Sequence, residues 1–105
     1  MLYRQGDVLL KRVEEMPADA VKLPRDGRRV VLAYGETTGH AHAVLDRGAE
    51  LYESKELEAR FLQVLADGGV DLVHEEHATI PVPPGTYEVV RQREYSPEEI
   101  REVAD

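Results

Sequence analysis

The chain has 105 residues, 42% of them hydrophobic and 32% charged, and its 21 acidic and 13 basic side chains give a net charge of −8. This length is typical of one domain, so we expect a single domain over residues 1–105. The negative field repels phosphate backbones and anionic membranes, so neither nucleic acid nor a membrane is expected as a partner. Because the chain contains no cysteine, disulfides, thiolate catalysis and cysteine-based zinc sites are excluded. No apolar run approaches the ~20 residues of a membrane span, and no signal-peptide core is visible, so a cytoplasmic protein is expected.

The first half of the chain predicts three strands separated by turns. Between the first two strands lies a loop with two prolines that turns at Asp26-Gly27. The second strand is ended or bulged by Gly35. The three expected strands are residues 7–13 (DVLLKRV), 30–36 (VVLAYGE) and 40–45 (HAHAVL), and a short extended segment follows at 51–53 (LYE).

Residues 54–66 allow two interpretations. Ser54 could cap a helix that Gly68 closes. Alternatively, residues 60–66 and 70–76 are two strands joined by the tight turn Asp67-Gly68-Gly69. We favour this hairpin because the segment after the turn has a clear strand pattern.

Residues 70–82 alternate in character like a half-buried strand. Side chains alternate between the two faces of a strand, so the even positions predict one buried face. On this face His74 and Glu76 point inward, and His77 lies on the outer face unless the backbone bulges. The even positions are Val70, Leu72, His74, Glu76, Ala78, Ile80 and Val82.

The four histidines of the chain fall into two clusters, which suggests a metal site. His40 and His42 share one strand face with Cα atoms about 6.5–7 Å apart, so both imidazoles can reach one ion. Adding His74 and Glu76 gives three nitrogens and one carboxylate oxygen, which suits Zn, Fe, Mn or Ni. A rival set replaces Glu76 with His77 and requires a kink in the backbone. The first set predicts that Glu76→Gln loses the metal while His77→Ala is nearly silent.

Two short motifs resemble those of the cupin superfamily. Gly35, the His40-Ala41-His42 pair and Asp46 are similar to its first motif, and Pro83 to Val90 (PPGTYEVV) is similar to the turn of its second. The spacing from the glycine to the histidines is one residue short, and Asp46 stands where cupins have glutamate. The resemblance implies a small β-barrel with a metal inside.

We therefore expect a mainly β fold: a small antiparallel β-barrel or cupin-like jelly roll over residues 1–95, with a short C-terminal helix at 96–105. Ser96, Pro97 and Glu99 have the pattern of a helix start with a capping box. The apolar stripe of this helix would pack on the barrel or on a second subunit of a homodimer. Just before it, Arg91 lies on a strand face that we interpret as solvated, the alternative being a pocket mouth that orients an anion.

The leading functional hypothesis is a protein with one divalent transition metal, held by His40, His42 and His74. Glu76 is then the fourth ligand or the base that handles a proton in a metal-dependent reaction on a small oxygen-containing substrate. The competing hypothesis is a non-catalytic interaction or assembly module in which the histidines are structural. A third possibility is a metal-free cluster of histidines that titrates.

Overall fold

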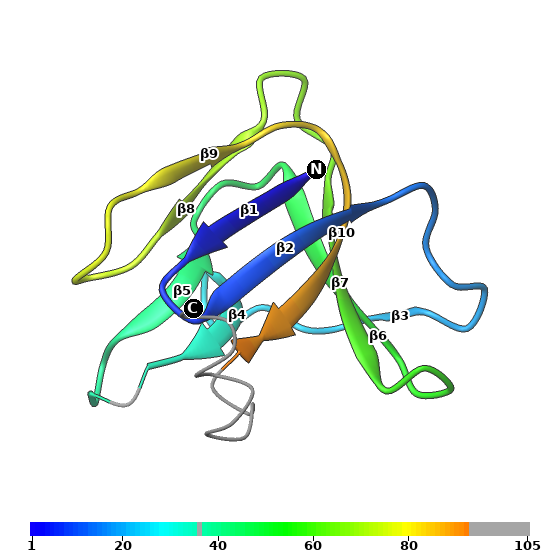
Figure 1. Cartoon of the computed structure of the whole chain (residues 1–105), viewed down its shortest axis with the longest axis horizontal. Coiled ribbons are helices and arrows are strands. Elements are labelled where there is room, and N and C mark those ends of the chain that lie inside the picture. Colours follow the sequence, from blue (N-terminus) through cyan, green and yellow to red (C-terminus); the bar gives the residue numbers. More distant parts are fainter. Residues whose placement is uncertain (36, 93–105) are drawn as a thin grey trace, which may run out of the picture.

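The computed structural model describes residues 1–35 and 37–92, and this part of the chain forms ten β-strands in two antiparallel sheets (Figure 1). The expected mainly β fold is confirmed, and the described residues contain no α-helix. The helix expected at 96–105 lies outside the described residues.

The larger sheet pairs six strands in the order β1-β2-β10-β7-β6-β3. The strand expected at 7–13 is confirmed as β2, and the short segment 51–53 lies within β6. The strands of this sheet are β1 (Leu2–Gln5), β2 (Val8–Val13), β3 (Val21–Lys22), β6 (Ala49–Ser54), β7 (Ala59–Val64) and β10 (Gly85–Arg91).

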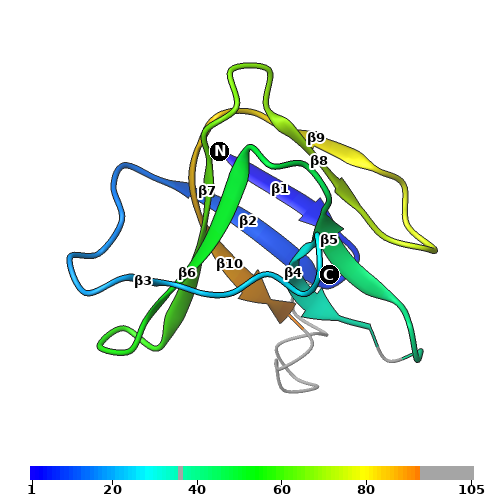
Figure 2. The same cartoon turned by 180° about the vertical axis from the view of Figure 1, so that it is seen from behind.

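The smaller sheet pairs four strands in the order β4-β5-β8-β9. The strands expected at 30–36 and 40–45 are confirmed as its first two members. β4 also contacts β6 of the larger sheet. Figure 2 shows the two sheets from behind. The strands of the smaller sheet are β4 (Val30–Tyr34), β5 (Ala41–Val44), β8 (Val70–Val73) and β9 (Ile80–Val82).

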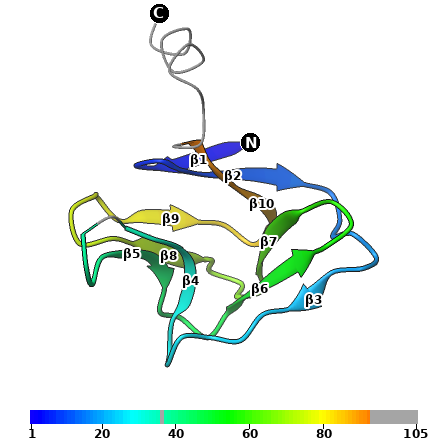
Figure 3. The same ribbon diagram turned by 90° about the horizontal axis from the view of Figure 1, so that it is seen from below.

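The core lies between the two sheets. Seen from below, the larger sheet is curved, with β1 and β2 above the smaller sheet and β6 and β7 beside it (Figure 3). Leu10 and Leu62 enter the core from the larger sheet and Leu32 and Leu72 from the smaller one, each with 0% of its surface exposed. Full burial stabilises the fold by about 1.5–3 kcal/mol for each such side chain. The apolar packing of these leucines therefore joins the two sheets.

Of the two expected forms, a β-barrel or a jelly roll, the described residues do not form a closed barrel. No strand pairing there joins the two sheets, and β1, β3, β4 and β9 remain as edges. The chain crosses to the other sheet between β3 and β4 and again after the β4–β5, β6–β7 and β8–β9 hairpins. Between the two sheets, apolar packing takes the place of strand pairing.

Residues 59–64 form a strand, as favoured over the helix, but the expected hairpin with the next strand is wrong. β7 pairs with β6 and β10, whereas β8 pairs with β5 and β9. The Asp-Gly-Gly turn therefore carries the chain between sheets. Gly69 has φ +78°, and a Cβ there would lie 2.5 Å from the carbonyl oxygen of Val82, so the chain packs too closely for a side chain.

The expected long strand over residues 70–82 is also wrong, because it is a hairpin. β8 and β9 pair with Leu72 opposite Ile80, and residues 74–79 form the loop between them. The loop sequence, HEEHAT, is polar and satisfies some of its own hydrogen bonds. Since the strand ends at Val73, alternation no longer assigns faces to the histidines and glutamates beyond it.

The sequence did not predict β1, which forms a hairpin with β2. Gln5 pairs with Val8, so Gly6 and Asp7 make a two-residue turn. Gly6 has φ +57°, a conformation that glycine adopts readily at the first position of such turns. The turn brings Gln5 and Asp7 to one end of the smaller sheet, where the histidines gather.

Candidate metal centre

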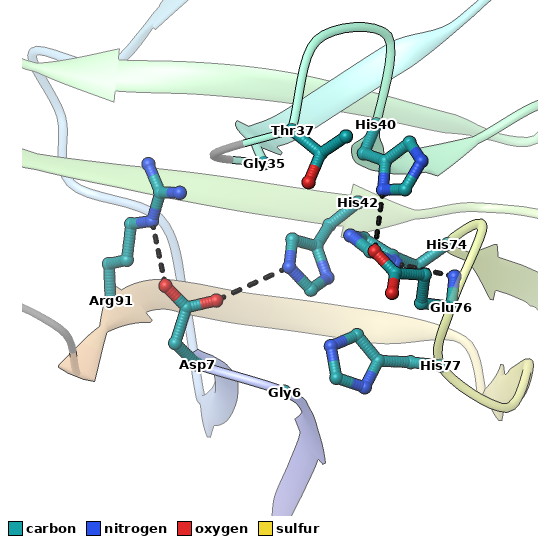
Figure 4. Close-up of a pocket in the computed structure, with 10 residues that line it drawn as sticks. All are labelled: Gly6, Asp7, Gly35, Thr37, His40, His42, His74, Glu76, His77 and Arg91. Carbon is teal, nitrogen blue, oxygen red and sulfur yellow. Dashed lines mark hydrogen bonds and ion pairs between the residues drawn. The ribbon is translucent and has the colours of Figure 1, made fainter.

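A cavity of about 370 Å³ opens at the end of the molecule where the β1–β2 turn meets β5 and the β8–β9 loop (Figure 4). This volume is within the range of small-molecule sites. All four histidines of the chain line it. The lining residues are Gly6, Asp7, Gly35, Thr37, His40, His42, His74, Glu76, His77 and Arg91.

The imidazole rings form one cluster with His74 at its centre. The ring centroid of His74 lies 4.3 Å from that of His42 and 4.6 Å from that of His77. The ring of His40 lies 5.7 Å from it on another side. Two segments far apart in the sequence thus bring all four histidines together, as the rival ligand set required.

Gln5 fixes the proton position of His42. Gln5 is 3% exposed, and its Nε2 donates hydrogen bonds to the carbonyl oxygens of Leu72 at 2.9 Å and Ala78 at 3.0 Å. Its Oε1 therefore faces Nδ1 of His42, at 2.9 Å, as an acceptor. A neutral His42 must carry its proton on Nδ1, which leaves Nε2 with a free lone pair.

His42 is 2% exposed, and its Nε2 lies 3.3 Å from Oδ1 of Asp7. Burial, together with the neighbouring His74 and against the attraction of Asp7, lowers the pKa of His42 to about 4. The imidazole is therefore neutral near pH 7, and its free Nε2 faces a carboxylate.

Asp7 is ionised and held in place by Arg91. Arg91 Nε donates to Oδ2 of Asp7 at 3.1 Å, and the same guanidinium donates to the carbonyl oxygen of Tyr34. Burial of Asp7 by itself raises its pKa, but the hydrogen bond and charge of Arg91 outweigh it, so the pKa lies below its usual value. Arg91 thus lines the cavity rather than a solvated strand face.

The sequence predicted that Glu76 points into the core, and this prediction is wrong. Its side chain is 65% exposed, and its Oε2 lies 2.9 Å from Nδ1 of His40. A carboxylate accepts only, so a neutral His40 also carries its proton on Nδ1 and leaves Nε2 free. The backbone N–H of Glu76 donates to Nδ1 of His74 at 3.0 Å, so a neutral His74 has the opposite proton position.

His77 lines the cavity instead of facing outward, because the loop bends after β8. Its ring lies 5.8 Å from that of His42, in a stacked arrangement. The ring packs against Gly6, where an added Cβ would lie 2.6 Å from His77 Nε2. The glycine of the β1–β2 turn therefore makes room for this histidine.

Glu75, which the sequence did not predict as a site residue, lies beside two of the histidines. Its Oε1 accepts the N–H of Ala41 at 2.9 Å, which ties the loop to β5 and lowers the pKa of Glu75. His40, His74 and Glu75 offer potential ligand atoms within 4.8 Å of one another, and they are the group of described residues that meets this criterion.

The carboxylate that the cupin resemblance implied lies elsewhere. Asp46 is exposed, accepts the N–H of Asp71 at 3.3 Å, and is not among the described residues that line the cavity. Asp7, which lines the cavity, and Gln5, which contacts His42, were not predicted. The signal for them was the Gly6-Asp7 pair between two apolar segments, a typical two-residue hairpin turn.

Fold and site together define a two-sheet β protein with a histidine-lined cavity at one end. A family model described as a domain of unknown function, DUF8820, matches residues 4–92. This is most of the chain, and the protein belongs to that family. No curated protein and no solved structure matches the chain. The described residues contain no helix that is long and apolar enough to cross a membrane.

Proposed function

We propose that this protein binds one divalent transition metal with the imidazoles of His40, His42, His74 and His77, and presents it to a small ligand in the adjoining cavity. The observation that carries the proposal is the convergence of all four histidines on one cavity. Imidazole nitrogen is a common ligand of Zn, Fe and Ni, and these ions are the expected occupants.

The proton positions of the strand histidines support this proposal. Histidine ligands typically donate their second N–H to a carboxylate, carbonyl or water, which orients the ring. His40 Nδ1 has Glu76 as this partner, and His42 Nδ1 has Gln5. Both rings therefore keep Nε2 free for an ion.

The cavity supports a role beyond structure. A structural metal site is closed by protein ligands, whereas a catalytic site keeps a position open to a ligand. Here about 370 Å³ of space adjoins the imidazoles. A metal would supply Lewis-acid chemistry to an oxygen-containing ligand. Glu76, which lines the same cavity and is exposed, is placed to exchange a proton with such a ligand.

A relation to the cupins is part of the same proposal. Two packed antiparallel sheets with a histidine pair at the start of β5 support a jelly-roll relative. The position of Asp46 away from the cavity counts against a shared ligand set. The relation therefore rests on the two packed sheets and the histidine pair.

The proposal is tested by elemental analysis of untagged protein, with a melting curve before and after treatment with a chelator. We expect about one equivalent of a transition metal per chain. We also expect chelation to lower the melting temperature by several degrees, because an ion bound only by the folded state stabilises it.

His74→Ala tests the site by mutation. His74 is the central ring of the cluster but is only half-buried, so its removal should disturb the fold little. The variant should lose the metal and keep the melting temperature of the chelated wild type. Wild-type protein that contains no metal, takes up none of Zn, Fe(II), Mn or Ni, and melts unchanged with chelator would disprove the proposal.

A further inference from the structure

Two hydrogen-bond acceptors face each other at the edge of the cavity. Nε2 of His42 and Oδ1 of Asp7 lie 3.3 Å apart. Gln5 holds the His42 proton on the opposite ring nitrogen, and Arg91 holds the carboxylate through its other oxygen. Neither group is free to turn away without breaking a hydrogen bond.

Such a pair needs a positive charge between or beside its lone pairs. A proton on Nε2 would make His42 an imidazolium, but this ring is 2% exposed and packed against His74 and His77. Burying an imidazolium there would cost free energy. A metal cation satisfies both lone pairs without that cost.

We propose that Asp7 is a ligand of the metal, binding it through Oδ1 beside Nε2 of His42. This inference rests on the proposed function, since it concerns the same ion. It adds a carboxylate from the β1–β2 turn to the imidazoles from β5 and the β8–β9 loop. Arg91 is then a positioning residue that fixes the orientation of the carboxylate.

The added oxygen ligand has a consequence for the choice of metal. Carboxylate oxygen suits harder ions such as Mn, while imidazole suits Zn, Fe, Cu and Ni. A mixed set of imidazole nitrogen and carboxylate oxygen suits divalent ions such as Fe(II), Mn(II) and Zn(II). Arg91 keeps the turn of Asp7 in place before any ion arrives, so this ligand is preorganised.

Glu75 is the rival carboxylate, because it lies within 4.8 Å of potential ligand atoms of His40 and His74. Its Oε1 already accepts the N–H of Ala41, and it is exposed. It also has no contact with His42 comparable to the 3.3 Å approach of Asp7 among the described residues. The geometry thus favours Asp7.

The test uses Co(II), whose visible absorption bands change with the ligands around it. Metal-free wild type, Asp7→Asn, Glu75→Gln and Asp46→Asn are each titrated with Co(II) at pH 7, and affinity and spectrum are recorded. Asp46→Asn is the matched control, because it removes an exposed carboxylate outside the cavity. Circular dichroism shows that each variant is folded.

We expect Asp7→Asn to shift the Co(II) bands and to weaken binding at least ~10-fold. Glu75→Gln and Asp46→Asn should keep the wild-type spectrum. An unchanged spectrum for Asp7→Asn overturns the inference even if its affinity falls, since a distant charge alters affinity without entering the coordination sphere. A spectral change in Glu75→Gln alone overturns it too.

If Asp7→Asn does not fold, Asp7→Glu replaces it, because this variant keeps the charge that pairs with Arg91. A changed spectrum again supports ligation by Asp7, and an unchanged one again overturns it. Failure of the proposed function looks different: the wild type itself then takes up no Co(II). If wild type binds Co(II) and His74→Ala does not, only the role of Asp7 is in question.

Discussion

The two walls of the cavity differ in how firmly they are built. On one wall, the β1–β2 turn and β5 hold Gln5, Asp7 and His42, and each side chain is fixed by at least one hydrogen bond or ion pair. Gln5 and His42 are almost completely buried. The other wall is the β8–β9 loop, where Glu75, Glu76 and His77 are exposed.

The proton positions show the same difference. His42 already has its free Nε2 toward the cavity, whereas His74 accepts a hydrogen bond at Nδ1 from the backbone of Glu76. To bind an ion through Nε2, a neutral His74 must move its proton to Nδ1, which breaks this bond. Under the proposed function, the buried wall would already be arranged for a metal, whereas the loop wall would have to adjust when one binds.

The largest effect is expected from the buried wall. His42→Ala should weaken metal binding at least ~100-fold and lower the free energy of unfolding by about 2–3 kcal/mol, because Gln5 Oε1 loses its buried donor. Metal titration and urea denaturation measure the two effects. His40→Ala is the control, since this half-buried residue should affect binding without a comparable loss of stability. Equal stability of His42→Ala and wild type would contradict the inference that the buried hydrogen bond from His42 to Gln5 holds this side of the cavity in place.

The pH dependence of the metal-free protein sharpens the comparison. His42 has a folded pKa of about 4 against 6.5 in the unfolded chain, so between these values only the unfolded chain is protonated. The contribution of neutral His42 to the free energy of unfolding is therefore complete above pH 6.5. It decreases as the pH falls toward 4, by about 3 kcal/mol at most.

Urea denaturation of chelated protein between pH 7 and pH 4 measures this slope. His42→Asn should lack this part of it, while carboxylates contribute equally in both proteins. A slope that is identical in the variant would show that His42 is not buried in its neutral form.

On the loop wall, His77→Ala should weaken metal binding by about 10- to 100-fold. Glu76→Gln should weaken it less, because the glutamine Oε1 still accepts the Nδ1 proton of His40. This reverses the order that the sequence alone predicted, because His77 lines the cavity and Glu76 acts through His40. Isothermal titration with Zn compares the two variants. A stronger effect of Glu76→Gln than of His77→Ala would favour the ligand set with Glu76 that the sequence predicted.

The smallest effect is expected from the contact between the walls. Gly6→Ala and Gly27→Ala should each lower the free energy of unfolding by about 1–2 kcal/mol. Both glycines have positive φ, +57° and +63°, which alanine adopts only with strain. A Cβ at Gly6 meets His77 Nε2, whereas a Cβ at Gly27 has no heavy atom within 4 Å. Only Gly6→Ala should therefore also weaken metal binding. Equal metal affinity in the two variants would show that His77 does not bind from its position against Gly6.

Sequence patterns worked where a strand is defined by its own residues. β2, β4 and β5 were predicted because their apolar residues follow one another between clear turn signals. The pattern failed at residues 70–82, where polar and apolar residues happen to alternate through a hairpin loop. Alternation is a property of strands, so it carries no information once the chain has turned.

The sequence by itself determined the mainly β fold, the strands that frame the site, and the grouping of the histidines into two clusters. The tertiary structure decided which side chains meet. Pairing of β8 with β5 and β9 brings His74 and His77 to His42, and the β1–β2 turn adds Gln5 and Asp7. Local sequence specifies backbone conformation and periodicity, but partners distant in the chain are selected by the packing of whole sheets, which no single segment encodes.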